Sequence, residues 1–133
     1  MVRLSVEGNV KLKASDIEFK MPRPSYTIDT LIYLKEKYPS YSFTVIIGSD
    51  SFLNIEKWKN HQQLLRENEV LVYERPNYPV KTGERNIVTV LKAPLLDISS
   101  TLIRGLVKSG KSIRYLVPEP VREEIERSGY YKS

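Results

Sequence analysis

The sequence predicts an α/β fold built on a parallel sheet, and two observations lead to that prediction. Short apolar runs that suit buried strands alternate with segments whose apolar residues recur at helical spacing. Strands separated by helices require crossover connections, which favour parallel pairing. A length of 133 residues fits one domain with a hydrophobic core. We therefore expect residues 1–133 to form a single α/β domain.

The first elements along the chain are atypical for such a fold. Met1 to Val6 is typical of the end of a helix, and Ser15–Phe19 is typical of a strand without an earlier partner. A doubly wound nucleotide-binding fold opens with a strand that leads into a phosphate-binding turn, and these residues contain no such opening. The next helix follows Pro24–Thr27 and has an apolar stripe of Ile28, Leu31, Ile32 and Leu34.

Three strands are expected in the middle of the chain. Phe43–Ile47 is almost continuously apolar and ends at Gly48, which predicts a strand buried on both faces. Val70–Tyr73 and Ile87–Leu91 have the same character. Together these segments supply the predicted sheet.

Two further helices are expected near the C-terminus. The first has an apolar stripe and is closed by Gly110 in the position after the C-cap. The second begins near Pro118 or Pro120, because proline suits the first helical turn, and ends at Gly129. The stripe consists of Leu102, Ile103, Leu106 and Val107.

Composition excludes several classes of protein. The absence of cysteine excludes disulfides, thiol nucleophiles and cysteine-based metal sites, and it indicates the reducing cytoplasm. His61 is the only histidine, so a multi-histidine metal centre is excluded. No apolar run approaches the roughly 18–20 residues that span a bilayer. The net charge of +5 permits phosphate binding, but the basic residues form no block, so we expect no nucleic-acid partner.

Ile98–Arg104 is the most informative segment for function. Ser99, Ser100 and Thr101 open an apolar helical pattern, and Arg104 lies one turn inside it. A helix N-terminus carries unpaired N–H groups and partial positive charge, so it attracts phosphate. The hydroxyls and the guanidinium would add hydrogen bonds to phosphate oxygens. The alternative is an ordinary serine or threonine N-cap.

A second group of candidates follows two of the predicted strands. Gly48 and Asp50 come directly after one strand and Arg75 after the next, at the carboxyl edge where open α/β sheets bind ligands. Gly48 allows close backbone approach, Asp50 would accept from ribose hydroxyls, and Arg75 would reach a phosphate. The alternatives are a strand-ending turn with Asp50 as a helix cap, and a solvated loop arginine.

A third group would suit a planar anion. Tyr26 and Thr27 precede a helix, whose N–H groups would attract a carboxylate. Trp58 is the only tryptophan and lies between two lysines, so it would serve either as an aromatic platform or as a half-buried core residue. For Tyr26 and Thr27 the alternative is helix capping by Ser25 or Thr27.

Taken together, these segments resemble the bacterial nicotinate-nucleotide adenylyltransferases of NAD biosynthesis. The resemblance covers essentially the whole chain, in the family's order and spacing. The matching pieces are Pro24–Leu31, Ile46–Ser51, Trp58, Arg75-Pro76, Ile98–Arg104 and Leu116–Val121.

The resemblance implies a Rossmann-like nucleotidyltransferase fold and a reaction of ATP with nicotinate mononucleotide that yields deamido-NAD and pyrophosphate. Mg²⁺ would accompany ATP without dedicated protein ligands. By the family pattern, three groups of residues would bind the substrates. These are Ser99, Ser100, Thr101 and Arg104 at the ATP phosphates; Gly48, Asp50 and Arg75 along the nucleotide; and Tyr26, Thr27 and Trp58 at the nicotinate ring.

One departure from the family pattern concerns catalysis. The family's H-x-G-H motif, whose histidines bind ATP, is absent from these 133 residues, since His61 stands in Asn60-His61-Gln62. We therefore identify no catalytic residue, interpret the chain as N-terminally truncated, and expect it to be inactive by itself. A sheet that lacks a central strand would also invite self-association.

Two other classes of function remain open at this stage. One is a related adenylyltransferase, such as the pantetheine-phosphate type, which would lack the anion site at Tyr26 and Thr27. The other is a non-catalytic module that binds a nucleotide or RNA. Strongly salt-dependent RNA binding without ATP binding would favour the second class.

Overall fold

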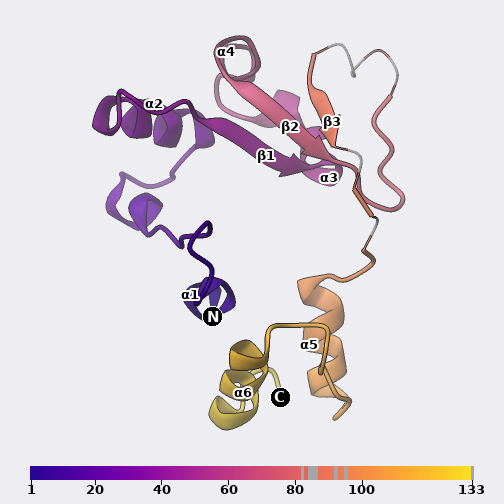
Figure 1. The fold of residues 1–133 in the computed structure, drawn as a ribbon. Helices are drawn as coiled ribbons and strands as arrows, with labels where there is room; N and C mark the ends of the chain where they lie inside the picture. Colours follow the sequence, from indigo (N-terminus) through magenta and orange to yellow (C-terminus); the bar gives the residue numbers. More distant parts are fainter. Residues whose placement is uncertain (82, 84–86, 92, 95, 133) are drawn as a thin grey trace. The chain divides into compact units, whose positions relative to one another are not determined.

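A computed structural model describes residues 1–81, 83, 87–91, 93–94 and 96–132, and these form two compact units (Figure 1). The sheet unit comprises Ile17–Asp97, and the helical unit comprises Met1–Asp16 together with Ile98–Ser133. Whether the two belong to one domain stays a prediction.

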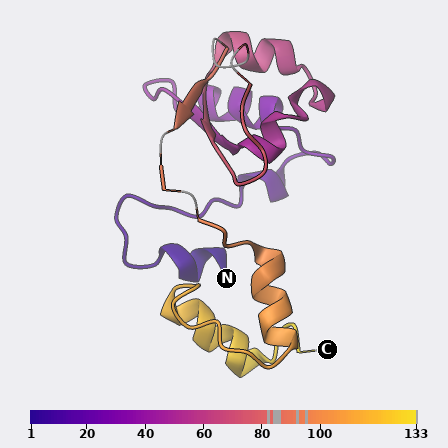
Figure 2. The same ribbon diagram turned by 90° about the vertical axis from the view of Figure 1, so that its right-hand side faces the viewer.

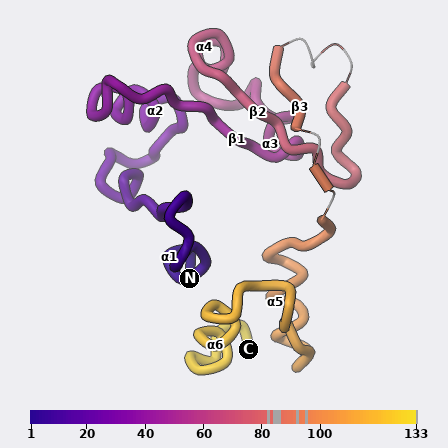
Figure 3. The backbone as a smooth tube through the Cα atoms, in the orientation of Figure 1, coloured from indigo at the N-terminus to yellow at the C-terminus, as the bar shows by residue number. Residues whose placement is uncertain are grey.

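The sheet unit contains a parallel sheet in the order β1-β2-β3, as the sequence predicts. Its path through strands and helices can be followed in Figure 3. The strands are β1 (Thr44–Gly48), β2 (Glu69–Tyr73) and β3 (Thr89–Leu91). The helices of this unit are η1 (Ile17–Lys20), α2 (Thr27–Lys37), α3 (Ser49–Phe52), η2 (Ile55–Lys57) and α4 (His61–Glu67).

One face of the sheet carries the core of this unit. The parallel register pairs Val45 with Val70 and Ile47 with Val72, and side chains two residues apart on a strand share a face. These side chains pack with apolar residues of the surrounding helices. The helical members of the cluster are Ile28 and Leu31 of α2, Phe52 of α3, Ile55 of η2 and Leu64 of α4.

The expectation that the first strand is buried on both faces is wrong. Ile46 is 65% exposed, because alternation along β1 points it away from the face that carries Val45 and Ile47. The continuous apolar run thus marks a strand with one covered face. A continuous apolar run does not by itself distinguish a strand with two covered faces from a strand with one.

The predicted strand at Ser15–Phe19 is also wrong. This part of the chain forms the short 3₁₀ helix η1, whose last turn is closed by the Met21 N–H donating to the Glu18 carbonyl at 3.4 Å. Phe19 is 78% exposed, so the alternating apolar residues of this segment do not form the buried face that stabilises a strand.

The helical unit consists of α1 (Val2–Val6), α5 (Ser100–Lys108) and α6 (Glu119–Ser128), seen from a second direction in Figure 2. A second apolar cluster joins the three helices, and all three occur where the sequence predicts them. The cluster contains Ile103, Ile113, Val121 and Ile125, with Leu4, Leu106, Val107, Leu116 and Val117 packed against it.

Both predicted glycine stops in the helical unit are confirmed. Gly110 has a φ of 69° after the C-cap of α5, and the N–H groups of Gly110 and Lys111 donate to the carbonyls of Val107 and Leu106. These two hydrogen bonds close the helix around a residue in the left-handed conformation, and glycine adopts that conformation without strain. Gly129, with a φ of 66°, ends α6 in the same region.

Candidate functional site

The carboxyl edge of the sheet holds a compact polar cluster at the ends of β1 and β2. The Arg75 N–H donates to Oγ of Ser49 at 2.8 Å, and the Arg75 guanidinium contacts the Asp50 carboxylate at 3.2 Å. Ser49 is fully buried, whereas Asp50 and Arg75 are each about one third exposed. The pair therefore presents both charges to solvent at the edge where ligands bind in open α/β sheets.

Gly48 is required by the packing of this cluster. A Cβ atom at Gly48 would lie 2.4 Å from Oδ1 of Asp50 and 3.1 Å from Cδ of Arg75. Its backbone φ of −74° is ordinary, so glycine is present here for space and not for conformation. Asp50 does not cap α3, because the N-cap is Gly48 and makes no side-chain cap bond.

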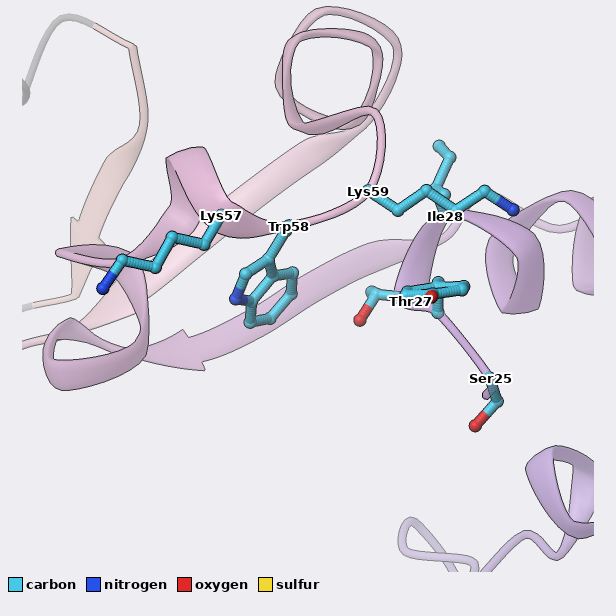
Figure 4. A pocket seen from close by; sticks show the side chains of 7 residues that line it. Ser25, Thr27, Ile28, Lys57, Trp58 and Lys59 are labelled. Atoms are coloured by element: carbon cyan, nitrogen blue, oxygen red, sulfur yellow. The ribbon is translucent and has the colours of Figure 1, made fainter. Parts of the chain in front are cut away.

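A pocket of about 290 Å³ lies at the start of α2 (Figure 4). Its walls come from the segment that leads into α2 and from the segment that follows η2. The lining residues are Ser25, Tyr26, Thr27, Ile28, Lys57, Trp58 and Lys59. The structure thus brings Tyr26, Thr27 and Trp58 together although more than 30 positions separate the first two from the third.

The start of α2 makes no side-chain cap bond. Tyr26 is the N-cap residue, and its phenol gives no hydrogen bond to the helix. Its carbonyl accepts the Thr30 N–H at 3.0 Å, but the N–H groups of the first turn have no partner within the helix. These donors and the positive end of the helix dipole lie at the start of α2, where Thr27 and Ile28 line the pocket.

The half-buried core position that the sequence context suggests for Trp58 is confirmed, whereas its role as an aromatic platform stays a prediction. The indole packs against the core of the sheet unit and is partly buried, and it also lines the pocket. Figure 4 shows the indole between Lys57 and Thr27, among the side chains that line the pocket. A partly buried indole on a pocket wall is suited to stacking on a planar ligand.

The start of α5 differs from the start of α2. Oγ of Ser99 accepts the Leu102 N–H at 3.1 Å, so Ser99 is a true N-cap and uses one of the free donors. The Arg104 guanidinium contacts Oγ1 of Thr101 at 3.3 Å, and both side chains, like Ser100, are exposed. A phosphate role for this segment, which belongs to the helical unit, stays a prediction.

Several residues of the pocket were not identified from the sequence. Ser25 and Ile28 line it because they flank the start of α2, and Lys57 and Lys59 because they flank Trp58. The two lysines beside the tryptophan were visible in the sequence. The partner of Lys59, Asp29, lies 30 positions away and had no local signal.

The described residues offer little to a metal ion. Within the parts of the chain that the structure describes, no group of three or more histidine, cysteine, aspartate or glutamate side chains is placed to bind one. In the same residues, no helix is both long and apolar enough to cross a bilayer.

Comparison with known proteins gives the family. A family model described as cytidylyltransferase-like matches residues 1–106. A probable nicotinate-nucleotide adenylyltransferase of Cytophaga hutchinsonii is 48% identical over 134 aligned residues, which cover 100% of this chain and 70% of the relative. The chain belongs to the nicotinate-nucleotide adenylyltransferase family. A relative of the same description from Flavobacterium johnsoniae is 42% identical, over 99% of this chain and 70% of its own length.

The fold agrees with that of solved nucleotidyltransferases. The Plasmodium falciparum nicotinic acid mononucleotide adenylyltransferase complexed with APC matches with a TM-score of 0.68 at 24% identity, over 81% of this chain and 59% of that one. Its complex with NaAD matches equally well, at 23% identity. The Rossmann-like nucleotidyltransferase fold is therefore confirmed for this adenylyltransferase-family chain, which spans less than two thirds of the solved enzyme.

Proposed function

We propose that the protein to which this chain belongs transfers the adenylyl group of ATP to the phosphate of nicotinate mononucleotide. A phosphate oxygen of the mononucleotide attacks the α-phosphorus of ATP, and the bond to the β-phosphate oxygen breaks. The products are deamido-NAD and pyrophosphate. The observation that carries the proposal is the pocket in which Trp58 faces the uncapped start of α2.

The pocket fits the nicotinate end of the acceptor. The pyridine ring would stack on Trp58, and its carboxylate would accept hydrogen bonds from the N–H groups around Tyr26 and Thr27. A volume of about 290 Å³ matches the lower end of ligand pockets. Backbone donors at a helix start favour an anionic carboxylate over a neutral carboxamide, which makes nicotinate the better ligand.

The edge cluster fits a nucleotide that lies along the sheet. Asp50 would accept from ribose hydroxyls, Arg75 would donate to phosphate or sugar oxygens, and Gly48 gives the ligand access to the backbone. Ser49 stabilises this arrangement, because its buried hydroxyl accepts a hydrogen bond from the Arg75 backbone N–H. A pre-organised charge pair lowers the cost of ordering these groups on binding.

The phosphates of ATP would bind the start of α5. Ser100, Thr101 and Arg104 are exposed, and Ser99 already fixes the first turn of the helix. Mg²⁺ would arrive on the ATP phosphates and neutralise part of their charge. Nucleotidyl transfer depends mainly on positioning and charge neutralisation, so this chain would contribute by binding and orienting the two substrates.

The cellular setting of this proposal is the cytoplasm, which suits a chain without cysteine. The partners are ATP and nicotinate mononucleotide, without nucleic acid or membrane. The 133-residue chain alone is expected to form no deamido-NAD, because its sequence has no H-x-G-H histidines. An assay for deamido-NAD tests this, and turnover would contradict it.

The single tryptophan makes the proposal testable by binding alone. Trp58 fluorescence of the 133-residue chain should be quenched saturably by nicotinate mononucleotide, and at higher concentration by nicotinamide mononucleotide. By calorimetry, Trp58→Ala should weaken nicotinate mononucleotide binding about tenfold, whereas Trp58→Phe keeps most of the affinity because stacking survives. Equal or tighter binding of phosphopantetheine would contradict the proposal and favour the pantetheine-phosphate type.

A further inference from the structure

Lys59 connects the two walls of the pocket. Its Nζ donates to both carboxylate oxygens of Asp29, at 2.8 and 3.1 Å, and lies 4.9 Å from the centroid of the Tyr26 ring. Asp29 and Tyr26 belong to the start of α2, and Lys59 follows Trp58 directly. One ammonium group therefore joins the segment after Trp58 to the start of α2, and Figure 4 shows the Lys59 side chain extending over Ile28.

Asp29 creates an electrostatic problem for an anionic ligand. It lies in the first turn of α2, two residues after Thr27, which lines the pocket. A carboxylate there stabilises the helix through the dipole, but it opposes the approach of a second negative charge. Lys59 neutralises Asp29 at ion-pair distance, and the side chains are only 43% and 35% exposed, so water screens the pair incompletely.

The neighbouring lysine does not share this task. Nζ of Lys57 donates to Oδ1 of Asn54 at 2.9 Å, on its own side of the pocket. Asn54 is neutral, so this bond leaves the charge of Lys57 uncompensated, whereas Lys59 forms the ion pair with Asp29. The cation–π contact also fixes the Tyr26 ring, whose residue supplies the N-cap backbone.

We propose that Lys59 is a specificity-determining positioning residue, which neutralises Asp29 and thereby lets the pocket prefer a pyridine carboxylate over the neutral carboxamide. This inference rests on the proposed function, since it concerns the same pocket. The inference goes beyond the proposed function because it assigns part of the anion preference to the Lys59–Asp29 side-chain pair, in addition to the backbone N–H groups.

The experiment compares nicotinate mononucleotide with nicotinamide mononucleotide on the 133-residue chain by Trp58 fluorescence. Both ligands carry the same phosphate, so the ratio of their dissociation constants isolates the ring substituent. The single variants are Lys59→Met and Lys59→Arg. A double variant combines Asp29→Asn with Lys59→Met, and Lys35→Met is the matched control. Lys35 lies at the other end of α2, where its Nζ donates to the Glu67 carbonyl.

We expect Lys59→Met to weaken nicotinate mononucleotide binding about fivefold and to change nicotinamide mononucleotide binding less than about twofold. Lys59→Arg should keep the preference. The double variant that removes Asp29 together with Lys59 should restore most of it, because the carboxylate that Lys59 neutralises is then absent as well. Lys35→Met should leave both constants unchanged. The loss in Lys59→Met should shrink at high salt.

Two results would overturn the inference while leaving the proposed function intact. One is a wild-type preference for nicotinate mononucleotide that Lys59→Met retains. The other is an equal loss for both ligands in Lys59→Met without recovery in the double variant, which would show a purely structural tie. A wild-type chain that binds neither mononucleotide, or binds both equally, would contradict the proposed function itself. Thermal unfolding of each variant confirms that it is folded.

Discussion

At the scale of single residues, Gly48 shows how closely the edge cluster is packed. Any side chain at this position would meet the Asp50 carboxylate and the Arg75 side chain at once. The neighbouring Ser49 is fully buried and holds the Arg75 backbone through its hydroxyl. These contacts bring Asp50 and Arg75 together at the ends of β1 and β2.

Gly48→Ala tests this packing. The new Cβ would force Asp50 and Arg75 to shift, because it would lie 2.4 Å from a carboxylate oxygen. We expect a folded protein that loses about 1 kcal/mol of stability or less, since both side chains are partly exposed and free to move outward. Affinity for ATP should fall about tenfold, as measured by calorimetry, because the ion pair no longer presents its charges in one geometry.

A matched control for that variant is Gly105→Ala in α5, where a Cβ would meet nothing within 4 Å. This change should leave ATP binding and the edge cluster unaffected and should not destabilise the helix, since alanine favours helices over glycine. Unchanged ATP affinity in Gly48→Ala would contradict a role for the edge cluster in nucleotide binding.

At the scale of elements, the starts of α2 and α5 show that similar sequences need not form the same N-terminal cap. Both helices follow hydroxyl-rich segments. Ser99 caps α5 with its side chain, whereas α2 starts at Tyr26 with no side-chain cap bond and opens onto the pocket. No side-chain cap bond uses a first-turn N–H group of α2, whereas Ser99 accepts one of those of α5.

Helix α6 carries the ion pairs that should make stability depend on pH. Hydrogen bonds from Arg122, at 2.6 and 3.0 Å, lower the pKa of Glu119 below its ordinary 4.5. Bonds from Ser128 and Arg127 likewise lower the pKa of Glu124. A carboxyl whose pKa is lower in the folded state adds stability above the unfolded value, and this stability is lost as pH falls below 4.5 through the folded pKa.

We therefore expect the denaturant midpoint to hold from pH 7 to about 5 and to fall below about 4.5. The loss should be small, because these side chains are at the surface. Glu119→Gln and Arg122→Met should each reduce the fall of the denaturant midpoint below pH 4.5, since either change removes the hydrogen bonds between Arg122 and Glu119. Chemical denaturation at a series of pH values measures it, and an unchanged slope in both variants would count against the assignment.

At the scale of the whole molecule, the open edge of the sheet is the feature that we expect to govern association. Among the described strands β1 pairs only with β2, and Ile46 on β1 is 65% exposed. An unpaired edge strand with an apolar side chain is a template for pairing with another chain. We propose that the 133-residue chain self-associates through β1.

Light scattering over a range of concentrations tests this proposal. The apparent mass should rise with concentration, and Ile46→Lys should reduce the rise, because a charge beside an edge strand opposes pairing. Tyr115→Lys, at an exposed position of the helical unit, is the matched control and should leave association unchanged. A monomer at every concentration would contradict the proposal.

Much of the fold could be predicted from local patterns. Apolar runs at Phe43–Ile47, Val70–Tyr73 and Ile87–Leu91 mark the strands, and Gly110 and Gly129 mark helix ends. Ser15–Phe19 was misassigned because a strand is defined by its neighbours, which a local pattern does not contain. The exposure of Ile46 was missed for the same reason, since burial depends on what covers each face of a sheet.

The sequence by itself determined the α/β class, the order of the elements and the motifs that resemble the adenylyltransferase family, because each depends on residues close together in the chain. Only the tertiary structure decided that Trp58 faces the start of α2, that Arg75 pairs with Asp50, and that Lys59 neutralises Asp29. Each of these contacts joins residues 25 to 30 or more positions apart. Such contacts follow from the parallel crossover, which brings the ends of successive strands and helices to one edge.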